Sequence, residues 1–218
     1  MPQNFPGIFP YAKDDVYTFS WTEVVDATGF VLYDAWSSNL NPTDKYHLTP
    51  STHMPDLVPG ISKNNTYVSG TASTSGSHNK DIDVDFDITP YNNPRTLRGQ
   101  AQVRVSLYLT SGGGNYETYV VARIRKWNGA TETEIASVQS VTESWNSTRS
   151  QGWTLPIDIP QTTFKYGEQL RLTIEVWTMV SAGSVTILLL CQPSDAAVGS
   201  ATAGNTRLLA IIPYKMIS

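Results

Sequence analysis

The chain has 218 residues, a formal net charge of −4 and one cysteine, Cys191. A chain of this length buries enough surface to fold as one domain without a metal or a disulfide. The single cysteine excludes an intramolecular disulfide framework. The acidic balance and the lack of any block of Lys or Arg exclude nucleic acid and anionic membranes as main partners, because phosphate binding needs a basic surface.

The first residues have neither a basic n-region nor an apolar h-region, and no apolar run reaches the roughly 18 residues of a membrane span. We therefore expect synthesis in a host cytoplasm, with no secretory signal and no transmembrane segment.

Residues 1–15 carry three prolines interleaved with Phe5, Ile8, Phe9 and Tyr11. Proline at this density favours extended backbone over helix. Two interpretations stay open for this N-terminal arm. It is a disordered start, or it lies on a neighbouring subunit, because its apolar side chains avoid water.

The remainder, 16–218, is predicted to be a single β-sandwich domain. Aromatic and β-branched runs predict strands over 16–25 and 30–36, with a glycine-containing turn at 26–29 between them. The proline-rich stretch 37–65 is predicted to be a long connection with a short strand near 46–49. The small polar residues of 69–79 predict a loop.

The clearest strand is 81–88, where four apolar residues alternate with four aspartates. Side chains alternate faces along a strand, so this pattern gives one core face and one wet face. Alternation also predicts a strand over 97–109 and an antiparallel partner over 116–127. The dipeptide Asn128-Gly129 then predicts a tight hairpin turn into 131–141.

Four more strands complete the prediction. The segment 153–159 is expected to be interrupted by Pro156 and bounded by Pro160, and 169–177 alternates cleanly. The apolar run 185–191 is expected to be buried on both faces, with Cys191 as a small buried hydrophobe. The segment 207–214 closes the chain. About ten strands without a convincing helix predict an all-β fold, and the long connections favour an antiparallel β-sandwich, for which we expect the jelly-roll type.

The aspartate row has two interpretations. Same-face carboxylates on a strand lie about 6.5–7 Å apart, too far for neighbours to chelate one ion readily. The first interpretation is therefore a solvated face opposite a basic strand, which carries either Arg123 and Arg125 or Arg98 and Arg104. The second is a calcium site or a contact between subunits.

Motifs for catalysis or cofactor binding are absent from the sequence. It has no Gly-x-Ser-x-Gly elbow and no Gly-x-x-x-x-Gly-Lys phosphate loop. Its histidines, His47, His53 and His78, lie in loop-like segments without the spacing of a zinc site. We therefore expect that the chain is not an enzyme and binds no metal or cofactor.

Six tryptophans raise a separate hypothesis. They are expected either to pack in the core and at interfaces or to form an exposed aromatic platform for sugars. Trp145 and Trp153 flank a polar loop, and Trp177 falls on the polar face of its strand. The alternative to a structural protein is thus a carbohydrate-binding module or an adhesin for host glycans.

Four segments carry a resemblance to a family. They are YTFSWTEVVDATGFVLYDAW, DIDVDFDITPYNNPRTLRGQAQVRVSL, FKYGEQLRLTIEVW and TRLLAIIPYKM, and they span nearly the whole chain. Together they resemble an uncharacterised group of virion proteins of tailed viruses. The resemblance implies a jelly-roll decoration or cement protein on the viral head, or a related accessory protein, and such proteins are often trimers. It transfers no functional residue.

The virion hypothesis predicts a homo-oligomer that contacts the major capsid protein or other virion proteins. Aromatic residues are enriched at such contacts, and the aspartate row offers charge contacts across a subunit boundary. The predicted interface residues are Phe5, Ile8, Phe9, Tyr11, Tyr17, Trp177, Asp81, Asp83 and Asp85.

Overall fold

The computed structural model describes residues 28–38, 45–50, 67–191 and 208–215. Within these ranges the chain forms 12 strands and no helix. The strands are β1 (Thr28–Ser38), β2 (Lys45–Pro50), β3 (Tyr67–Ser73), β4 (Asn79–Asp87), β5 (Arg95–Ser111), β6 (Tyr116–Trp127), β7 (Glu132–Gln139), β8 (Glu143–Trp145), β9 (Arg149–Phe164), β10 (Gln169–Val180), β11 (Ser184–Leu190) and β12 (Leu209–Lys215).

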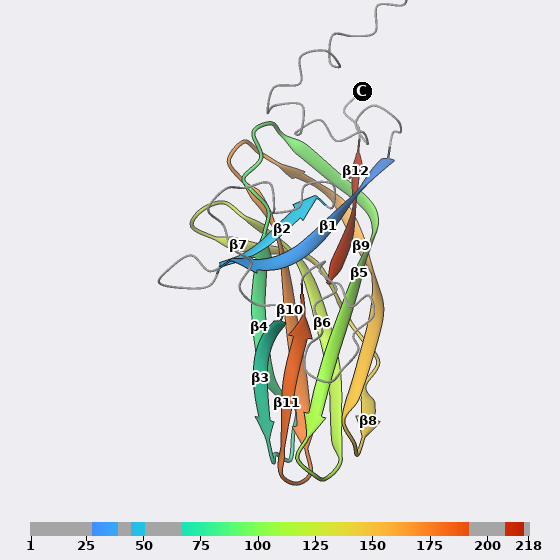
Figure 1. Ribbon diagram of the computed structural model, residues 1–218. Helices are drawn as coiled ribbons and strands as arrows, with labels where there is room; N and C mark the ends of the chain where they lie inside the picture. Colours follow the sequence, from blue (N-terminus) through green and yellow to red (C-terminus); the bar gives the residue numbers. More distant parts are fainter. Residues whose placement is uncertain (1–27, 39–44, 51–66, 192–207, 216–218) are drawn as a thin grey trace, which may run out of the picture.

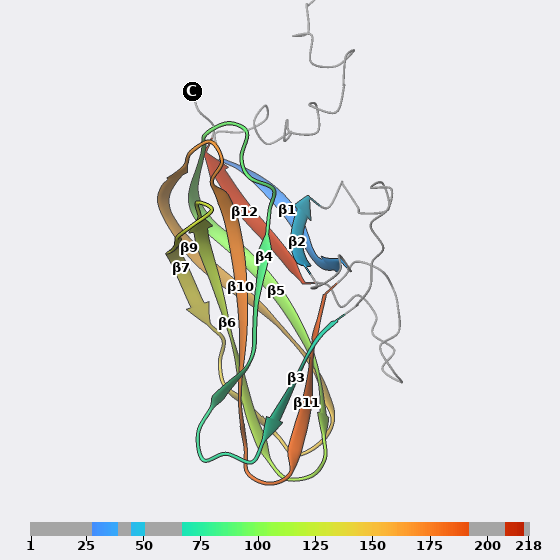
Figure 2. The same ribbon diagram turned by 90° about the vertical axis from the view of Figure 1, so that its left-hand side faces the viewer.

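The strands form two layers along the long axis of the molecule (Figures 1 and 2). One layer has the order β4–β10–β6–β7, with β8 pairing with β6. The other is built on β5, which pairs with β9 on one side and with β11 and β12 on the other. Strand β3 extends β11, and β1 and β2 extend β12. Two parallel bridges join the layers: His47 with Asp87 connects β2 to β4, and Thr74 with Val180 connects the end of β3 to β10.

One hydrophobic core lies between the two layers. It is built from the alternate residues of each strand, because a strand turns every second side chain to the same face. Each fully buried aliphatic or aromatic side chain contributes about 1.5–3 kcal/mol. The core side chains include Ile82, Val84, Phe86, Val103, Val105, Leu107, Val120, Ile124, Leu155, Ile157, Leu172 and Ile174. The predicted all-β sandwich is confirmed, while the jelly-roll strand order stays a prediction.

Two segments differ from the sequence prediction. Strand β9 continues through Pro156 and Pro160. Both prolines are tolerated because β9 pairs only with β5 among the described strands, and an edge strand has N–H positions that need no partner. Residues 69–73, predicted as loop, belong to β3 and pair with β11. The sequence did not indicate a strand here because β3 consists mainly of small and polar residues.

Two smaller corrections concern turns and burial. Gly29, predicted in a turn, pairs with Tyr214 inside β1. Strand β11 is not buried on both faces throughout, because Thr186 is exposed. The predicted strand 16–25, the connections 39–44 and 51–66 and the N-terminal arm lie outside the described residues.

Gly70 of β3 is predicted to be intolerant of any side chain. A Cβ at this position would lie 2.7 Å from the carbonyl oxygen of Asp81 and 2.8 Å from Cγ1 of Ile82. Overpacking of this kind costs about 1–3 kcal/mol. We expect Gly70→Ala to lower the urea unfolding midpoint accordingly. The matched control is Gly76→Ala, where nothing lies within 4 Å, and equal midpoints for the two variants would contradict the packing of β3 on β4.

Cys191 is predicted to be inert in the folded protein. Its side chain is 1% exposed, and burial raises the pKa of the thiol to about 12. The thiolate is the reactive form, so Ellman's reagent at pH 8 is expected to label Cys191 only after unfolding in urea. Labelling of the native protein at the rate of a free thiol would contradict the burial.

Candidate functional site

Strand β1 presents apolar side chains to the outside of the sandwich. Phe30 and Leu32 are 54% and 39% exposed, whereas Tyr33 faces the core. Antiparallel pairing sets Phe30 beside Pro213 and Leu32 beside Ile211 of β12, and directly paired residues share one face of a sheet. We call Phe30, Leu32, Ile211 and Pro213 the β1–β12 strip.

The strip ends where the same face of β1 becomes buried. Asp34 and Trp36 are 2% and 3% exposed. The ring of Trp36 stacks on His47 of β2, with centroids 4.5 Å apart and planes at 26°. The carboxylate of Asp34 has no hydrogen-bond partner among the described residues. The exposed apolar surface is therefore confined to Phe30 and Leu32 of β1, with the partly buried Ile211 and the buried Pro213 of β12 beside them.

Three tyrosines fix the two strands of the strip from the inner side of the sheet. The hydroxyl of Tyr214 lies 2.6 Å from that of Tyr33 and 2.8 Å from that of Tyr91, so the three form a hydrogen-bonded chain. The ring of Tyr91 also packs edge-on against Phe164. Burial raises the pKa values of Tyr91 and Tyr214 well above the ordinary value. The hydroxyls thus stay neutral, and β1 and β12 are fixed to the body of the sandwich.

The outer face of the other layer carries ion pairs centred on Arg171 of β10. Its guanidinium donates to both carboxylate oxygens of Asp87, at 2.7 and 2.8 Å. The same group lies 3.2 Å from Asp85 and 3.3 Å from Glu132 of β7. It also covers the ring of Trp127, 4.7 Å from the centroid. Bidentate pairs of this kind are the stronger class of ion pair, so Arg171 links three strands.

The aspartate row therefore faces basic residues, as the first interpretation of the sequence predicted, and they include the predicted Arg125. The main partner is Arg171 on the adjacent strand, and Arg125 lies 4.0 Å from Asp85. Arg98 and Arg104 are on β5 of the opposite layer. Local periodicity could not choose among these arginines because the choice depends on strand order.

Asp81 departs from the row. The pairing of β4 with β10 shifts register between Val176 and Trp177, and this bulge takes Asp81 out of the ladder. Burial raises the pKa of Asp81, although hydrogen bonds to Thr178 oppose the shift. Among the described residues, no three His, Cys, Asp or Glu side chains gather in a metal-binding arrangement.

Glu175 is the buried acid of this face, although it falls among the polar positions of the alternating run 169–177. It is 3% exposed and accepts hydrogen bonds from Arg123 at 3.0 and 3.2 Å and from the Trp177 indole at 2.9 Å. Burial alone would raise its pKa, but these bonds, with the charges of Arg123 and Lys80, hold the pKa below its ordinary value. Arg123 also donates to Glu134 of β7 at 2.9 Å.

Trp177 is held in a row of side chains across three strands. Its ring is stacked on Tyr119, with centroids 6.0 Å apart and planes at 10°. The ammonium of Lys80 lies 6.0 Å from the Trp177 ring centroid. These contacts involve the ring in the fold of its own chain, and they leave its predicted role at an interface a prediction.

The predicted interface residues fall into two groups. Phe5, Ile8, Phe9, Tyr11 and Tyr17 lie outside the described residues. Asp81, Asp83, Asp85 and Trp177 lie on the β4–β10 face, in the layer opposite the β1–β12 strip. Phe30 and Leu32 were not predicted as site residues. In the run 30–33 every residue is apolar or aromatic, so alternation carried no sign of which side faces outward.

No protein-family model and no curated protein matches the chain by sequence. Among solved structures, it is similar to an aminopeptidase from the marine sediment archaeon Thaumarchaeota archaeon. The TM-score is 0.48 and the identity 9%, over 84% of this chain and 37% of that one. A CocE/NonD family hydrolase from Staphylococcus aureus gives a TM-score of 0.39 and 14% identity, over 84% of this chain and 40% of the hydrolase.

These hydrolases overturn the expectation from the sequence that the chain is not an enzyme. That expectation rested on motifs that are contiguous in sequence, and a catalytic site assembled by the fold leaves no such motif. The chain spans well under half the length of these hydrolases, and at these identities and TM-scores the likeness assigns it none of their activities.

A similarity to a viral protein is weaker. The infectious bursal disease virus VP2 subviral particle matches with a TM-score of 0.27 and 9% identity, over 79% of this chain and 44% of that one. The described part of the chain contains no helix with the length and apolar character needed to cross a membrane.

Glu175 is predicted to stabilise the fold in a pH-dependent way. Its pKa is lower in the folded chain than its ordinary value of 4.5, so its contribution is present above pH 4.5 and is lost as the pH falls through the folded pKa. We expect Glu175→Gln to cost on the order of 3 kcal/mol at pH 7, because it leaves Arg123 without a buried partner.

The measurement is urea unfolding of wild type and Glu175→Gln between pH 7 and pH 3. The difference between the two proteins is expected to shrink on acidification. Glu143→Gln, which removes a partly buried glutamate of β8 with no ion pair among the described residues, is the control. A difference that stays constant across the pH range would show that the charge of Glu175 does not matter.

Proposed function

We propose that the protein is a structural component of a tailed-virus particle, a decoration or cement protein that assembles as a homo-oligomer through the β1–β12 strip. The observation that carries this proposal is the exposure of Phe30 and Leu32 on one rigid strand face. Contiguous apolar surface of this kind is typical of contacts between proteins. The resemblance of the sequence to virion proteins of tailed viruses supports the proposal that the assembly in question is a virus particle.

The strip differs from the other exposed apolar side chains of the described chain. Tyr67, Val141 and Tyr166 are 37%, 67% and 76% exposed, and each lies on a different element. Single exposed hydrophobic residues are common on protein surfaces and need no explanation. Phe30 and Leu32 instead share one face of one strand, with Ile211 and Pro213 beside them.

The occupant proposed for the strip is a second copy of the chain. The 27 residues before Thr28 contain Phe5, Ile8, Phe9, Tyr11 and Tyr17 and join β1 two residues before Phe30. In each copy, this segment with its apolar residues is therefore joined to the chain next to that copy's own β1–β12 strip. On the same face, the strip adjoins the exposed Gln100 and Gln102 of β5, with the exposed Arg104 and Lys215 at its two ends.

The test is the mass in solution of the full chain by light scattering at several concentrations. We expect an oligomer, with three times the chain mass of 24.0 kDa favoured. The double variant Phe30→Ser/Leu32→Ser and a variant lacking residues 1–15 are both expected to shift to monomer. Val141→Ser, which removes a more exposed apolar side chain outside the strip, is expected to leave the mass unchanged.

Three outcomes separate the parts of this proposal. A monomeric wild type would overturn assembly. An oligomer that survives Phe30→Ser/Leu32→Ser would remove the strip from the contact. Loss of the oligomer in the strip variant but not in the truncated chain would show that the strips contact each other without the N-terminal arm.

A further inference from the structure

A groove lies at the end of the molecule where β6, β8 and β10 meet their loops. Its volume is about 630 Å³, and its lining comes from three segments that are far apart in the sequence. The lining residues are Asn115, Tyr116, Glu117, Ser144, Trp145, Asn146, Ser147, Arg149, Met179 and Ser181. In Figure 1 this end carries β8, and β1 and β12 lie toward the other end.

The backbone around the groove is fixed by hydrogen bonds between the loops. The N–H of Asn115 donates to the hydroxyl of Ser181 at 3.0 Å, and the carbonyl of Asn115 accepts from the N–H and the hydroxyl of Ser181 at 2.8 Å each. The Tyr116 hydroxyl donates to the carbonyl of Ser147 at 2.7 Å. A binding surface on loops held in this way needs little ordering when a ligand arrives.

Close approach of the backbones requires a glycine at this end. Gly114 has a φ of +83°, and a Cβ there would lie 2.5 Å from the carbonyl oxygen of Ala182. The β5–β6 and β10–β11 loops are thus packed together, and the positions of Asn115 and Ser181 follow from this contact.

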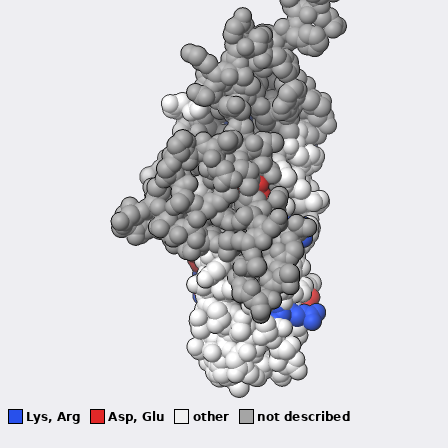
Figure 3. Space-filling model, in the orientation of Figure 1, with Lys and Arg blue, Asp and Glu red and all other residues white. Residues whose placement is uncertain are grey.

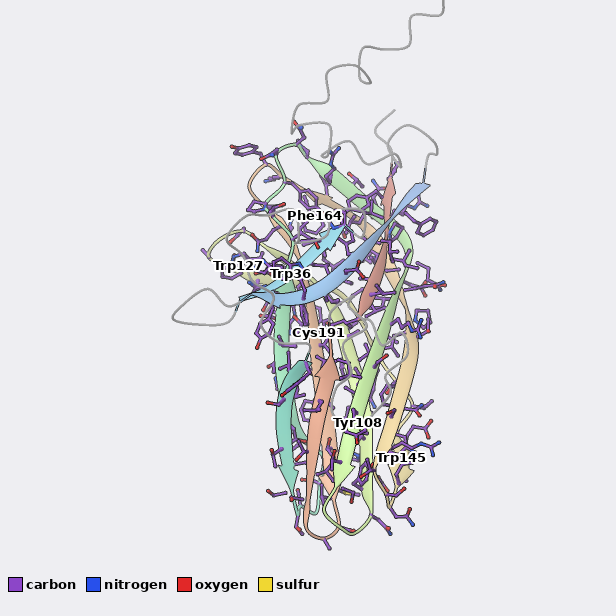
Figure 4. The ribbon with its side chains drawn as sticks, in the orientation of Figure 1. Trp36, Tyr108, Trp127, Trp145, Phe164 and Cys191 are labelled. Atoms are coloured by element: carbon purple, nitrogen blue, oxygen red, sulfur yellow. The ribbon has the colours of Figure 1, made fainter. Side chains whose placement is uncertain are left out.

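Trp145 gives the groove an aromatic wall. Its ring lies 5.7 Å from Tyr116 and 6.4 Å from Trp153, centroid to centroid, and these neighbours hold its orientation. Trp145 is only partly buried, whereas Trp36 and Trp153 are buried. Figure 4 shows Trp145 near the β8 end, well apart from Trp36 and Trp127. Met179 adds a second apolar surface.

The polar side chains of the groove have unused hydrogen-bonding capacity. The amides of Asn115 and Asn146, the hydroxyl of Ser144 and the guanidinium of Arg149 form no side-chain hydrogen bond or ion pair within the described part of the chain. An amide offers two donors and an acceptor, and a hydroxyl offers both. The groove lined by Trp145 therefore offers both donors and acceptors.

The charge of the groove is balanced. Glu117 and Arg149 are its two charged lining residues, and in the view of Figure 3 this end of the molecule is mostly uncharged surface. A nucleic acid or another strongly charged ligand would meet no matching field. A neutral ligand rich in hydroxyl groups fits both the mixed donors and acceptors and the aromatic wall.

We propose that this groove binds a neutral oligosaccharide, with Trp145 stacking on a sugar ring and Asn115, Asn146 and Ser144 bonding to its hydroxyls. The volume lies within the roughly 300–1,000 Å³ of small-molecule sites. The site goes beyond the proposed assembly function and lies in a different part of the fold from the β1–β12 strip. A chain assembled through the strip would keep the groove available to a glycan.

The probe is a printed array of bacterial and algal polysaccharides and mammalian glycans, read with the labelled full-length chain. The strongest array ligand is then titrated by calorimetry and by tryptophan fluorescence. We expect binding by the wild type, at least tenfold weaker binding by Asn146→Ala/Ser144→Ala, and loss of binding by Trp145→Ala. Asn93→Ala, an exposed asparagine in the loop between β4 and β5, is the matched control and should bind like wild type.

The double variant keeps the test valid even if Trp145→Ala fails to fold, because Ser144 and Asn146 are exposed. Absence of binding to every array glycan would overturn the proposal. Binding that survives Asn146→Ala/Ser144→Ala unchanged would also overturn it, because the ligand would then lie elsewhere. Measuring the Phe30→Ser/Leu32→Ser variant in parallel separates this result from assembly, since a monomer with an intact groove should keep its intrinsic affinity.

Discussion

Burial of every second side chain between two layers is the constraint on which the rest of this structure depends. On β4 it sends Ile82, Val84 and Phe86 inward, and it thereby leaves the carboxylates on the outer face. Those carboxylates must then find partners. Arg171 of β10 provides the partner for Asp85 and Asp87, and Lys80 of β4 itself provides it for Asp83. The charged face is thus a consequence of how the core is built.

Much of the fold could be predicted from the sequence, because period-two alternation reports directly on one-sided burial. The strands around Phe86, Val105 and Ile174 follow from it, and Asn128-Gly129 marks the hairpin between β6 and β7. The failures have physical causes. Pro156 and Pro160 looked like strand breaks because their tolerance depends on β9 having one neighbour. Gly70 was assigned to a loop because glycine is common in loops. The reason for a glycine there is the close approach of β4, and this contact exists only in the folded chain.

Much less of the candidate sites could be predicted from the sequence. Phe30 and Leu32 sit in a run where both faces are apolar, so only the packing of β1 reveals which pair is left outside. Glu175 looked like a solvated residue because Arg123 and Trp177 cover it only in the folded sheet. The groove combines Asn115, Trp145 and Met179 from three strands and their loops. Only the tryptophan next to a polar loop hinted at it.

The prolines of β9 also limit how copies of this chain can join. A long strand at the border of a layer normally offers a line of free N–H and C=O groups to which a foreign strand can add. Pro156 and Pro160 remove two donors of the same parity from the middle of that line. Growth by edge-to-edge sheet extension is thereby blocked along β9. The assembly proposed above would therefore use side-chain surfaces such as the β1–β12 strip and not an added strand along β9.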